Sequence, residues 1–285
     1  MLIKKIISKI YSLFIFLYKV TKLRIKLVPI DRQLPFKGKI ASNGYSQFHI
    51  SESTIKSLKI LKKNRLDKSN KIFLSINEKD ALNEIFTLVA PEIRNYLGKE
   101  SFLDGINWME TDAIKSHSTL KQSNSISWHT DNVGNRLKLF LCIKGDGTQP
   151  TLILPDKNRV PNFTRWLFIT FMESFRRLGI RNKINITNSI EIKHYTGTAN
   201  IFDTQLLHRG KYEKSMVKRI ILCLEFSNPK KHSISRGAIG TKENFNSFAL
   251  DKNLLKIKSF KTILDPDRIH QGSESLLYML NSKDS

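Results

Sequence analysis

Two histidines, an aspartate and an arginine lie in three strand-like segments that are far apart along the chain. They are His129 and Asp131, His208, and Arg219. In an extended strand alternate side chains share a face, so His129 and Asp131 can point at one metal ion. His208 can complete such a triad only if the fold places its segment beside the first one. These residues therefore constrain the fold more than any other feature of the sequence.

The residue types indicate the chemistry. Two imidazoles and one carboxylate on one side of an ion leave positions open, as in non-haem Fe(II) oxygenases. The open positions are needed for a bidentate 2-oxo acid and dioxygen. A guanidinium forks onto a carboxylate, so Arg219 can anchor the far carboxylate of 2-oxoglutarate. Ser215 could add a hydrogen bond, although a serine in a lysine-rich turn also commonly bonds its own backbone.

With these motifs the chain resembles the Fe(II)/2-oxoglutarate oxygenase superfamily, and within it the phytanoyl-CoA dioxygenase-like family. The resemblance covers 125–228 and rests on His129-Thr130-Asp131, on the run that ends at His208, and on the spacing of Ser215 and Arg219 after it. It implies a mainly β fold with flanking helices and a double-stranded β-helix, or jelly-roll, core. It also implies iron held by His129, Asp131 and His208, and 2-oxoglutarate held by Arg219 and Ser215.

The resemblance further implies a hydroxylase that couples oxidation of 2-oxoglutarate to oxidation of a second substrate. A lipid, a glycolipid or a cell-envelope sugar would suit the basic surface. One alternative is a nucleic-acid-modifying oxygenase, which also needs a basic surface. The demethylase pattern of a second arginine six residues after Arg219 is missing, however, because that position is Glu225. The other alternative is a catalytically inactive barrel that binds a membrane or a partner.

Length and composition favour one catalytic domain with additions at both ends. A chain of 285 residues can bury a large core. We expect an amphipathic segment at 1–30 and a single oxygenase domain at 31–285. Within that domain we expect a helical part at 31–105, the β-helix core at about 106–230 and an extension at 231–285. The two cysteines, Cys142 and Cys223, lie in apolar runs and predict free thiols in a reducing compartment.

The net charge of +23 favours association with an anionic partner, and the two obvious ones are nucleic acid and a lipid surface. In the first 22 residues, isoleucine, leucine and phenylalanine gather on one helical face and most lysines and serines on the other. The uncharged run 10–18 is too short to span a bilayer, which takes about 20 apolar residues. Such a helix suits the interface of an anionic membrane, and we expect a cytoplasmic protein peripherally attached to it. A helix packed on the domain and a mitochondrial presequence are the alternatives.

Periodicity predicts the other elements. An amphipathic helix is expected over 77–90, capped by Asn77, and a second helix over 161–180. The segments 136–143 and 151–154, joined by a glycine-containing turn, predict a strand pair. The lysine-rich stretch 38–70 indicates a solvated helix face or a second basic patch. His117 and His194 lack ligand-like neighbours and are interpreted as ordinary polar residues, and Lys138 as a solvated lysine although it could reach the co-substrate.

Overall fold

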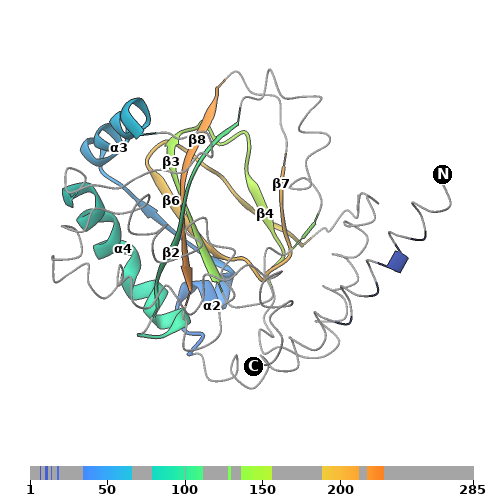
Figure 1. Ribbon diagram of the computed structural model, residues 1–285. Helices are drawn as coiled ribbons and strands as arrows, with labels where there is room; N and C mark the ends of the chain where they lie inside the picture. The colour runs from blue at the N-terminus through green and yellow to red at the C-terminus, as the bar shows by residue number, and fades with distance from the viewer. Residues whose placement is uncertain are drawn as a thin grey trace, which may run out of the picture.

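A computed structural model describes residues 35–65, 79–99, 101–111, 128–129, 136–155, 188–211 and 217–227, and five single residues near the amino terminus. The elements follow one another as α2 (Lys39–Asn43), β1 (Tyr45–His49), α3 (Glu52–Arg65), α4 (Lys79–Leu97), β2 (Phe102–Thr111), β3 (Arg136–Lys144), β4 (Thr151–Ile153), β5 (Ile190–Ile192), β6 (Thr198–Asp203), β7 (His208–Gly210) and β8 (Arg219–Ser227). The described part of the chain is thus rich in strands and carries a few helices (Figure 1).

The strands form two antiparallel sheets. The larger sheet has five strands in the order β1-β6-β3-β8-β2, and the smaller has three in the order β5-β4-β7. An isolated antiparallel bridge between His129 and His208 extends the smaller sheet beyond β7. In Figure 1 the helices α3 and α4 lie on one side of the larger sheet and β4 and β7 on the other.

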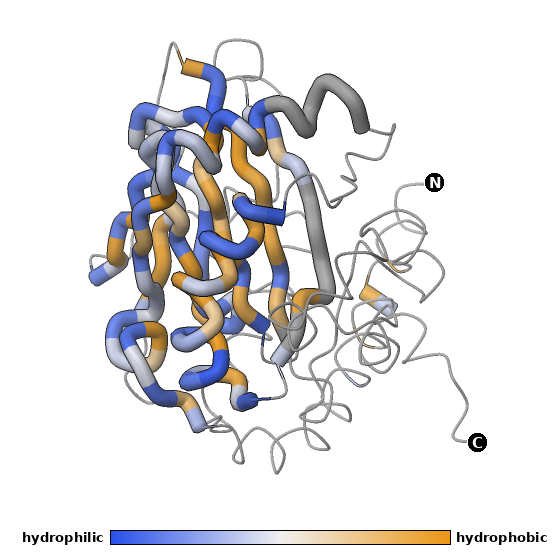
Figure 2. The backbone as a smooth tube through the Cα atoms, turned by 90° about the vertical axis from the view of Figure 1, so that its left-hand side faces the viewer, coloured by the Kyte–Doolittle hydropathy of each residue, from blue (hydrophilic) through white to orange (hydrophobic). Residues whose placement is uncertain are grey.

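The face of the larger sheet that meets the helices, here called the outer face, is apolar. Leu139 of β3, Ile201 of β6 and Leu224 of β8 stand side by side in the strand register and are fully buried. They belong to one hydrophobic cluster with Leu82 and Val89 of α4. Each buried leucine or isoleucine stabilises the fold by about 1.5–3 kcal/mol, so this cluster holds the helices to the sheet. Figure 2 shows hydrophobic stretches running along the strands.

Helix α4 confirms the predicted amphipathic helix and extends it to Leu97. Leu82, Ile85, Phe86 and Val89, the four apolar residues at helical spacing, are all buried. The expected cap, Asn77, lies outside the described residues, as do the predicted helix over 161–180 and His117. The part of the chain expected to be helical also supplies one strand, β1, which pairs with β6 at the edge of the larger sheet.

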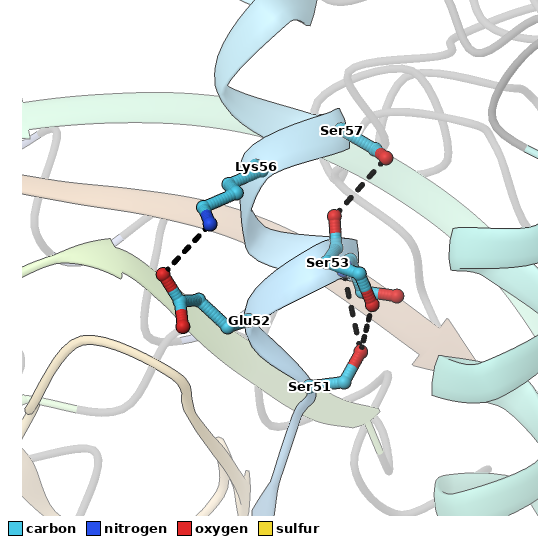
Figure 3. Close-up of polar contacts among 6 residues, drawn as sticks. Ser51, Glu52, Ser53, Lys56 and Ser57 are labelled. Atoms are coloured by element: carbon cyan, nitrogen blue, oxygen red, sulfur yellow. Dashed lines mark hydrogen bonds and ion pairs between the residues drawn. The ribbon is translucent and has the colours of Figure 1, made fainter.

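The start of α3 is tied to α4 by hydrogen bonds to Glu84. Figure 3 shows the polar contacts of Ser51 and its neighbours within the first turns of α3. Ser51 Oγ accepts a bond of 3.3 Å from the backbone N–H of Thr54, as a helix cap does, and donates at 2.6 Å to Glu84 of α4. Thr54 Oγ1 donates to the same carboxylate at 2.6 Å. Burial alone would raise the pKa of Glu84, but the bonds from Ser51 and Thr54 outweigh it and lower that pKa.

Within the lysine-rich stretch, Lys56 and Lys59 of α3 are exposed to solvent. Lys56 pairs with Glu52 at 3.0 Å while its side chain stays 69% exposed. Such an exposed pair, one helical turn apart, contributes only a few tenths of a kcal/mol.

The two strands predicted over 136–143 and 151–154 exist as β3 and β4, but they do not pair with each other. Both edges of β3 are occupied, by β6 and by β8, so no edge is left for β4. The connecting residues carry the chain across to the smaller sheet, where β4 pairs with β5 and β7. The predicted pairing was therefore wrong, and the turn between the strands is a crossing between sheets.

The other face of the larger sheet, here called the inner face, meets the smaller sheet. Phe202 of β6 clusters with Ile153 of β4 and Ile192 of β5. Phe140 of β3 packs edge-on against Phe202, with ring centroids 5.0 Å apart. The interior between the two sheets is therefore lined by side chains from both, and it contains the site described next.

Candidate metal and carboxylate site

His129 and His208 come together at the edge of the smaller sheet. Each donates its backbone N–H to the carbonyl oxygen of the other, at 3.0 and 2.9 Å. Directly opposed residues of an antiparallel pair project to the same face, and the two imidazole rings accordingly lie 4.5 Å apart between centroids. Both residues are buried, at 8% and 6% exposure. The expected meeting of the two histidines is thus present in the fold.

The ring of His208 is oriented by its own chain. Its Nδ1 lies 2.9 Å from the carbonyl oxygen of Leu206. A carbonyl oxygen can only accept, so Nδ1 carries the hydrogen and the lone pair belongs to Nε2. Ring contact with Phe202, 5.6 Å between centroids, fixes the other side. A carbonyl that accepts from one ring nitrogen and leaves the other nitrogen free to bind is how histidine ligands of metal ions are commonly oriented.

Asp131, the third predicted ligand, lies outside the described residues. Among the residues that are described, no three His, Cys, Asp or Glu side chains gather in a way that could hold a metal ion. Ser215 also lies outside them. The structure therefore places two of the three predicted ligands together and leaves the roles of Asp131 and Ser215 as predictions.

Arg219, at the start of β8, points into the interior between the sheets. Its Nη1 donates to the carbonyl oxygen of Gln149, and its Nη2 donates to Thr111 Oγ1 at 3.3 Å. Thr111 was not identified from sequence, although it stands opposite Arg219 in the register of β2 and β8. Strand pairing is needed to find it, because 108 positions separate the two residues.

The guanidinium of Arg219 makes no ion pair with a carboxylate of the described residues, and its buried Nε has no hydrogen-bond acceptor there. Burial lowers the pKa of Arg219. Gln149, 4% exposed, likewise has a buried side-chain Nε2 without an acceptor. Unsatisfied buried donors beside an unpaired cation cost free energy, so this region fits an anionic ligand.

His194 is a second residue of this interior that sequence reasoning missed. It is 1% exposed, its ring lies 5.6 Å from that of Phe140, and its Nε2 lies 2.9 Å from Thr151 Oγ1. Burial, with a smaller contribution from the charge of Arg219, lowers the pKa of His194 to about 3. The available signal was its position two residues after Ile192, on the same face of an alternating segment.

The thiol of Cys142 lies in the same neighbourhood. Its Sγ donates to the carbonyl oxygen of His194 at 3.5 Å, and burial raises the pKa of Cys142 to about 12 despite the nearby positive charge of Arg219. Both Cys142 and Cys223 are buried free thiols, as expected. With Cys142 and His194 neutral at pH 7, Arg219 carries the positive charge of this neighbourhood.

Lys138 differs from the solvated lysine expected from sequence. It stands on the inner face opposite Glu225, whose carboxylate lies 3.6 Å from its Nζ, and its side chain is 19% exposed. Arg136 pairs with the same carboxylate at 2.8 Å. Glu225, which replaces the second arginine of the demethylase pattern, therefore balances two cations inside the fold.

No protein-family model matches the chain, and no curated protein matches it significantly. Some solved structures are similar. The non-heme monooxygenase ThoJ in its apo form is 11% identical with a TM-score of 0.46, over 81% of this chain and 96% of that one. Apo HygX from Streptomyces hygroscopicus is 9% identical with a TM-score of 0.47, over 74% and 93%. HygX has also been solved with nickel and 2-oxoglutarate bound.

SnoN, a non-heme alpha ketoglutarate dependent epimerase from nogalamycin biosynthesis, is 9% identical with a TM-score of 0.42, over 73% of this chain and 84% of that one. At such identities and TM-scores these likenesses do not assign a family to this chain.

Proposed function

We propose that this chain is an Fe(II)- and 2-oxoglutarate-dependent oxygenase that hydroxylates its substrate. The observation that carries the proposal is the placement of His129 and His208, ring beside ring, at the edge of an interior that also holds an arginine without a carboxylate partner among the described residues. The two histidines suit a divalent metal ion, and Arg219 suits a carboxylate of the co-substrate.

Strand order supports a double-stranded β-helix, the jelly-roll core of the predicted family. From β2 in the larger sheet the chain passes back and forth between the sheets, and only β4 and β5 are consecutive strands of one sheet. The segment at His129 is in the smaller sheet, β3 in the larger, β4 and β5 in the smaller, β6 in the larger, β7 in the smaller and β8 in the larger. An alternating, antiparallel path through two facing sheets is what a jelly roll requires. The phytanoyl-CoA dioxygenase-like family within this fold remains part of the proposal.

In this proposal His129, Asp131 and His208 hold Fe(II), and Arg219 with Ser215 holds 2-oxoglutarate. Asp131 is two residues from His129, the spacing that lets both side chains share a face. When bound, iron and 2-oxoglutarate would allow dioxygen to convert a substrate C–H group into an alcohol, with 2-oxoglutarate oxidised to succinate and carbon dioxide. The chain supplies position and exclusion of water, because Phe140, Phe202 and Ile153 wall the interior beside His208 with apolar groups.

Release of succinate from 2-oxoglutarate by the full-length protein tests the proposal. We expect Fe(II)-dependent succinate from the wild type, and none above background from His129→Ala or Arg219→Ala. His49→Ala, which removes an exposed histidine of β1, is the matched control and should keep the activity. If the wild type binds neither Fe(II) nor 2-oxoglutarate in titrations, the inactive-barrel alternative replaces the enzyme.

We further propose that the substrate is a lipid, a glycolipid or a cell-envelope sugar, and that the protein attaches peripherally to the cytoplasmic face of a membrane. The described helical residues near the amino terminus support this. Five of them are large, apolar and 45–69% exposed, namely Ile7, Ile10, Tyr11, Phe14 and Tyr18. At 100° per residue they fall within one stripe about 100° wide, the usual width of an apolar helix face. Lysines flank them in sequence, and 1–30 contains no Asp or Glu.

Sedimentation with vesicles tests the membrane proposal. Among the described residues no helix has the length and apolarity to cross a bilayer. We expect the wild type to bind phosphatidylglycerol-containing vesicles more tightly than neutral ones, and Phe14→Glu to weaken binding severalfold. Leu88→Glu, on an exposed position of α4, is the matched control. Tight, steeply salt-dependent binding to RNA or DNA instead of vesicles would favour the nucleic-acid alternative.

A further inference from the structure

A hydrogen-bonded turn between β6 and β7 lies immediately before His208. It begins at Asp203, the last residue of β6, and is closed by the N–H of Leu206, which donates to the carbonyl oxygen of Asp203 at 3.2 Å. Inside the turn the N–H of Gln205 donates to Asp203 Oδ1 at 2.8 Å, as in an Asx turn. The carbonyl oxygen of Leu206 then accepts from His208 Nδ1 at 2.9 Å. The orientation of the His208 ring therefore depends on the shape of this turn.

The carboxylate at the start of the turn is held from helix α4. Tyr96 Oη donates to Asp203 Oδ2 at 2.5 Å, across 107 positions of sequence. Both residues are buried, at 0% and 3% exposure. The ring of Phe36 packs edge-on against that of Tyr96, with centroids 4.9 Å apart, and holds the hydroxyl in place. A buried carboxylate is costly without donors, and hydrogen bonds to it are of the strong, charge-assisted kind. The bond from Tyr96 therefore fixes the side chain around which the turn is built.

Other contacts hold the same turn to the two sheets. Thr204, 0% exposed, donates both its N–H and its Oγ1 to the carbonyl oxygen of Arg136, at 3.0 and 3.1 Å. Leu206, 1% exposed, packs with Ile153 and Phe202 between the sheets. The carboxylate of Asp203 makes none of these contacts. Its removal should therefore loosen the turn without displacing the strands on either side.

We infer that Tyr96 and Asp203 are positioning residues for the metal-binding nitrogen of His208. Tyr96 holds Asp203, and Asp203 shapes the turn. The carbonyl group of Leu206 then keeps the hydrogen of the ring on Nδ1 and the lone pair on Nε2, where a metal ion can use it. This inference rests on the proposed function, because it concerns the same metal ion. It extends the residues that support the metal site to α4, on the far side of the larger sheet from the smaller one (Figure 1).

Titration of the full-length protein with Co(II), a spectroscopically visible substitute for Fe(II), tests the role of the hydroxyl. Tyr96→Phe keeps the ring and removes the hydroxyl, so we expect the Kd for Co(II) to rise about tenfold, as when a residue that supports a metal ligand is lost. Val89→Ala, which removes fully buried apolar groups from the same helix, is the matched control. It should lower stability and leave the Kd unchanged.

Substitutions of Asp203 test the carboxylate. Asp203→Asn can still accept from Gln205 through its oxygen and can donate its amide hydrogen to Tyr96, so it should bind Co(II) nearly as the wild type does. Asp203→Ala loses both bonds and should weaken binding at least as much as Tyr96→Phe. In an Asp203→Ala background, Tyr96→Phe should have no further effect on the Kd, because the two residues act through one bond.

The nitrogen-15 chemical shifts of the His208 ring, recorded without metal, give a measurement that a loss of stability alone would not change. The signal is identified by its absence from His208→Gln. We expect hydrogen on Nδ1 in the wild type and in Val89→Ala, and a mixture of the two neutral forms in Tyr96→Phe and Asp203→Ala. A ring that keeps its hydrogen on Nδ1 in both of these last variants overturns the positioning role, whatever the Kd does.

The outcomes separate the inference from the function beneath it. Wild-type protein that binds no Co(II) overturns the proposed function and this inference together. Wild-type binding that Tyr96→Phe and Asp203→Ala both leave unchanged overturns the inference alone and leaves the proposed function standing.

Discussion

The two faces of the larger sheet are made by the same strands and differ in almost every other respect. In β6 all six residues are buried, yet Ala199 and Ile201 join the apolar cluster under the helices while Asn200 and Phe202 face the smaller sheet. The outer face is mostly apolar, with Asp203 bonded to Tyr96 of α4 as a polar exception, whereas the inner face carries two arginines, a lysine and a glutamate. Burial alone therefore does not distinguish the residues that hold the fold from those that form a site.

The contrast has a thermodynamic basis. Each apolar side chain on the outer face gains free energy from leaving water, in proportion to its area. Each polar side chain on the inner face loses free energy of hydration when it is buried, and a hydrogen bond inside the protein does little more than offset that loss. A polar interior such as that around Arg219 is expected where a ligand repays the cost. Substitutions on the two faces should accordingly affect different measurements.

The largest effect is expected on the outer face. Leu139→Ala removes a fully buried side chain from the hydrophobic cluster and should lower the free energy of unfolding by about 2–5 kcal/mol. Urea unfolding measures this, with Leu88→Ala on the exposed side of α4 as a control that should change stability by less than about 0.5 kcal/mol. The folded variant should bind 2-oxoglutarate as the wild type does. A weakened affinity for 2-oxoglutarate would mean that the outer face also affects ligand binding.

The inner face should make stability depend on pH through His194. Its pKa is about 3 in the folded chain, below the ordinary value, so between about pH 6.5 and pH 3 the unfolded chain binds a proton that the folded chain does not. The free energy of unfolding should therefore fall as the pH falls through this window, by up to about 1.4 kcal/mol per pH unit. Unfolding curves at several pH values measure the slope.

The control for that slope is His49, an exposed histidine. His194→Gln should flatten the dependence on pH, and His49→Gln should not. An unchanged slope in His194→Gln would mean that other groups cause the acid sensitivity.

A smaller effect is expected when the charge at position 219 is kept and its shape is changed. Arg219→Lys retains a cation but loses the planar fork that bonds Gln149 and Thr111 together. We expect the Kd for 2-oxoglutarate to rise about tenfold, with little change in Tm. Arg94→Lys in α4 is the matched control. A large fall in Tm with unchanged affinity would instead make Arg219 a structural residue of the inner face.

The smallest effect is expected where the helices that cover the outer face are joined. Ser51→Ala removes the cap of α3 and one bond to Glu84, and should lower the free energy of unfolding by about 1 kcal/mol. Ser57→Ala removes an exposed hydroxyl that bonds only its own helix, and should cost less. Equal effects of the two substitutions, measured by urea unfolding, would show that neither the cap nor the link to α4 adds to stability.

The sequence predicted the elements whose apolar residues recur at a regular spacing. The stripe on α4 follows from helical spacing, and β3 follows from an apolar run with a period near two. Strand pairing was less accessible: β4 was assigned to β3, because the sequence does not reveal that β6 and β8 already occupy both edges of that strand. Pairings between residues far apart in sequence depend on the whole arrangement of the sheets.

The residues of the candidate site likewise fall into those that the sequence predicted and those that only the structure reveals. His129, His208 and Arg219 were found because their residue types and order form a pattern. Thr111 and His194 belong to no such pattern. Their hydrogen-bond partners, Arg219 and Thr151, lie 108 and 43 positions away in the sequence. Lys138 was interpreted as solvated because its counter-charge, Glu225, belongs to another strand. Site residues defined only by contacts across strands are accessible from the structure and not from one sequence.

The central position of β3 has a consequence for how such a chain can change during evolution. Because successive residues of a strand face opposite ways, inserting or deleting one residue between Leu137 and Cys142 would reverse every side chain beyond that point. Leucines would then line the interior between the two sheets, and Phe140 and a thiol would enter the hydrophobic cluster. Point substitutions can alter one face at a time, whereas a change of length here would disrupt both at once, so length variation among descendants should concentrate in the connections between strands.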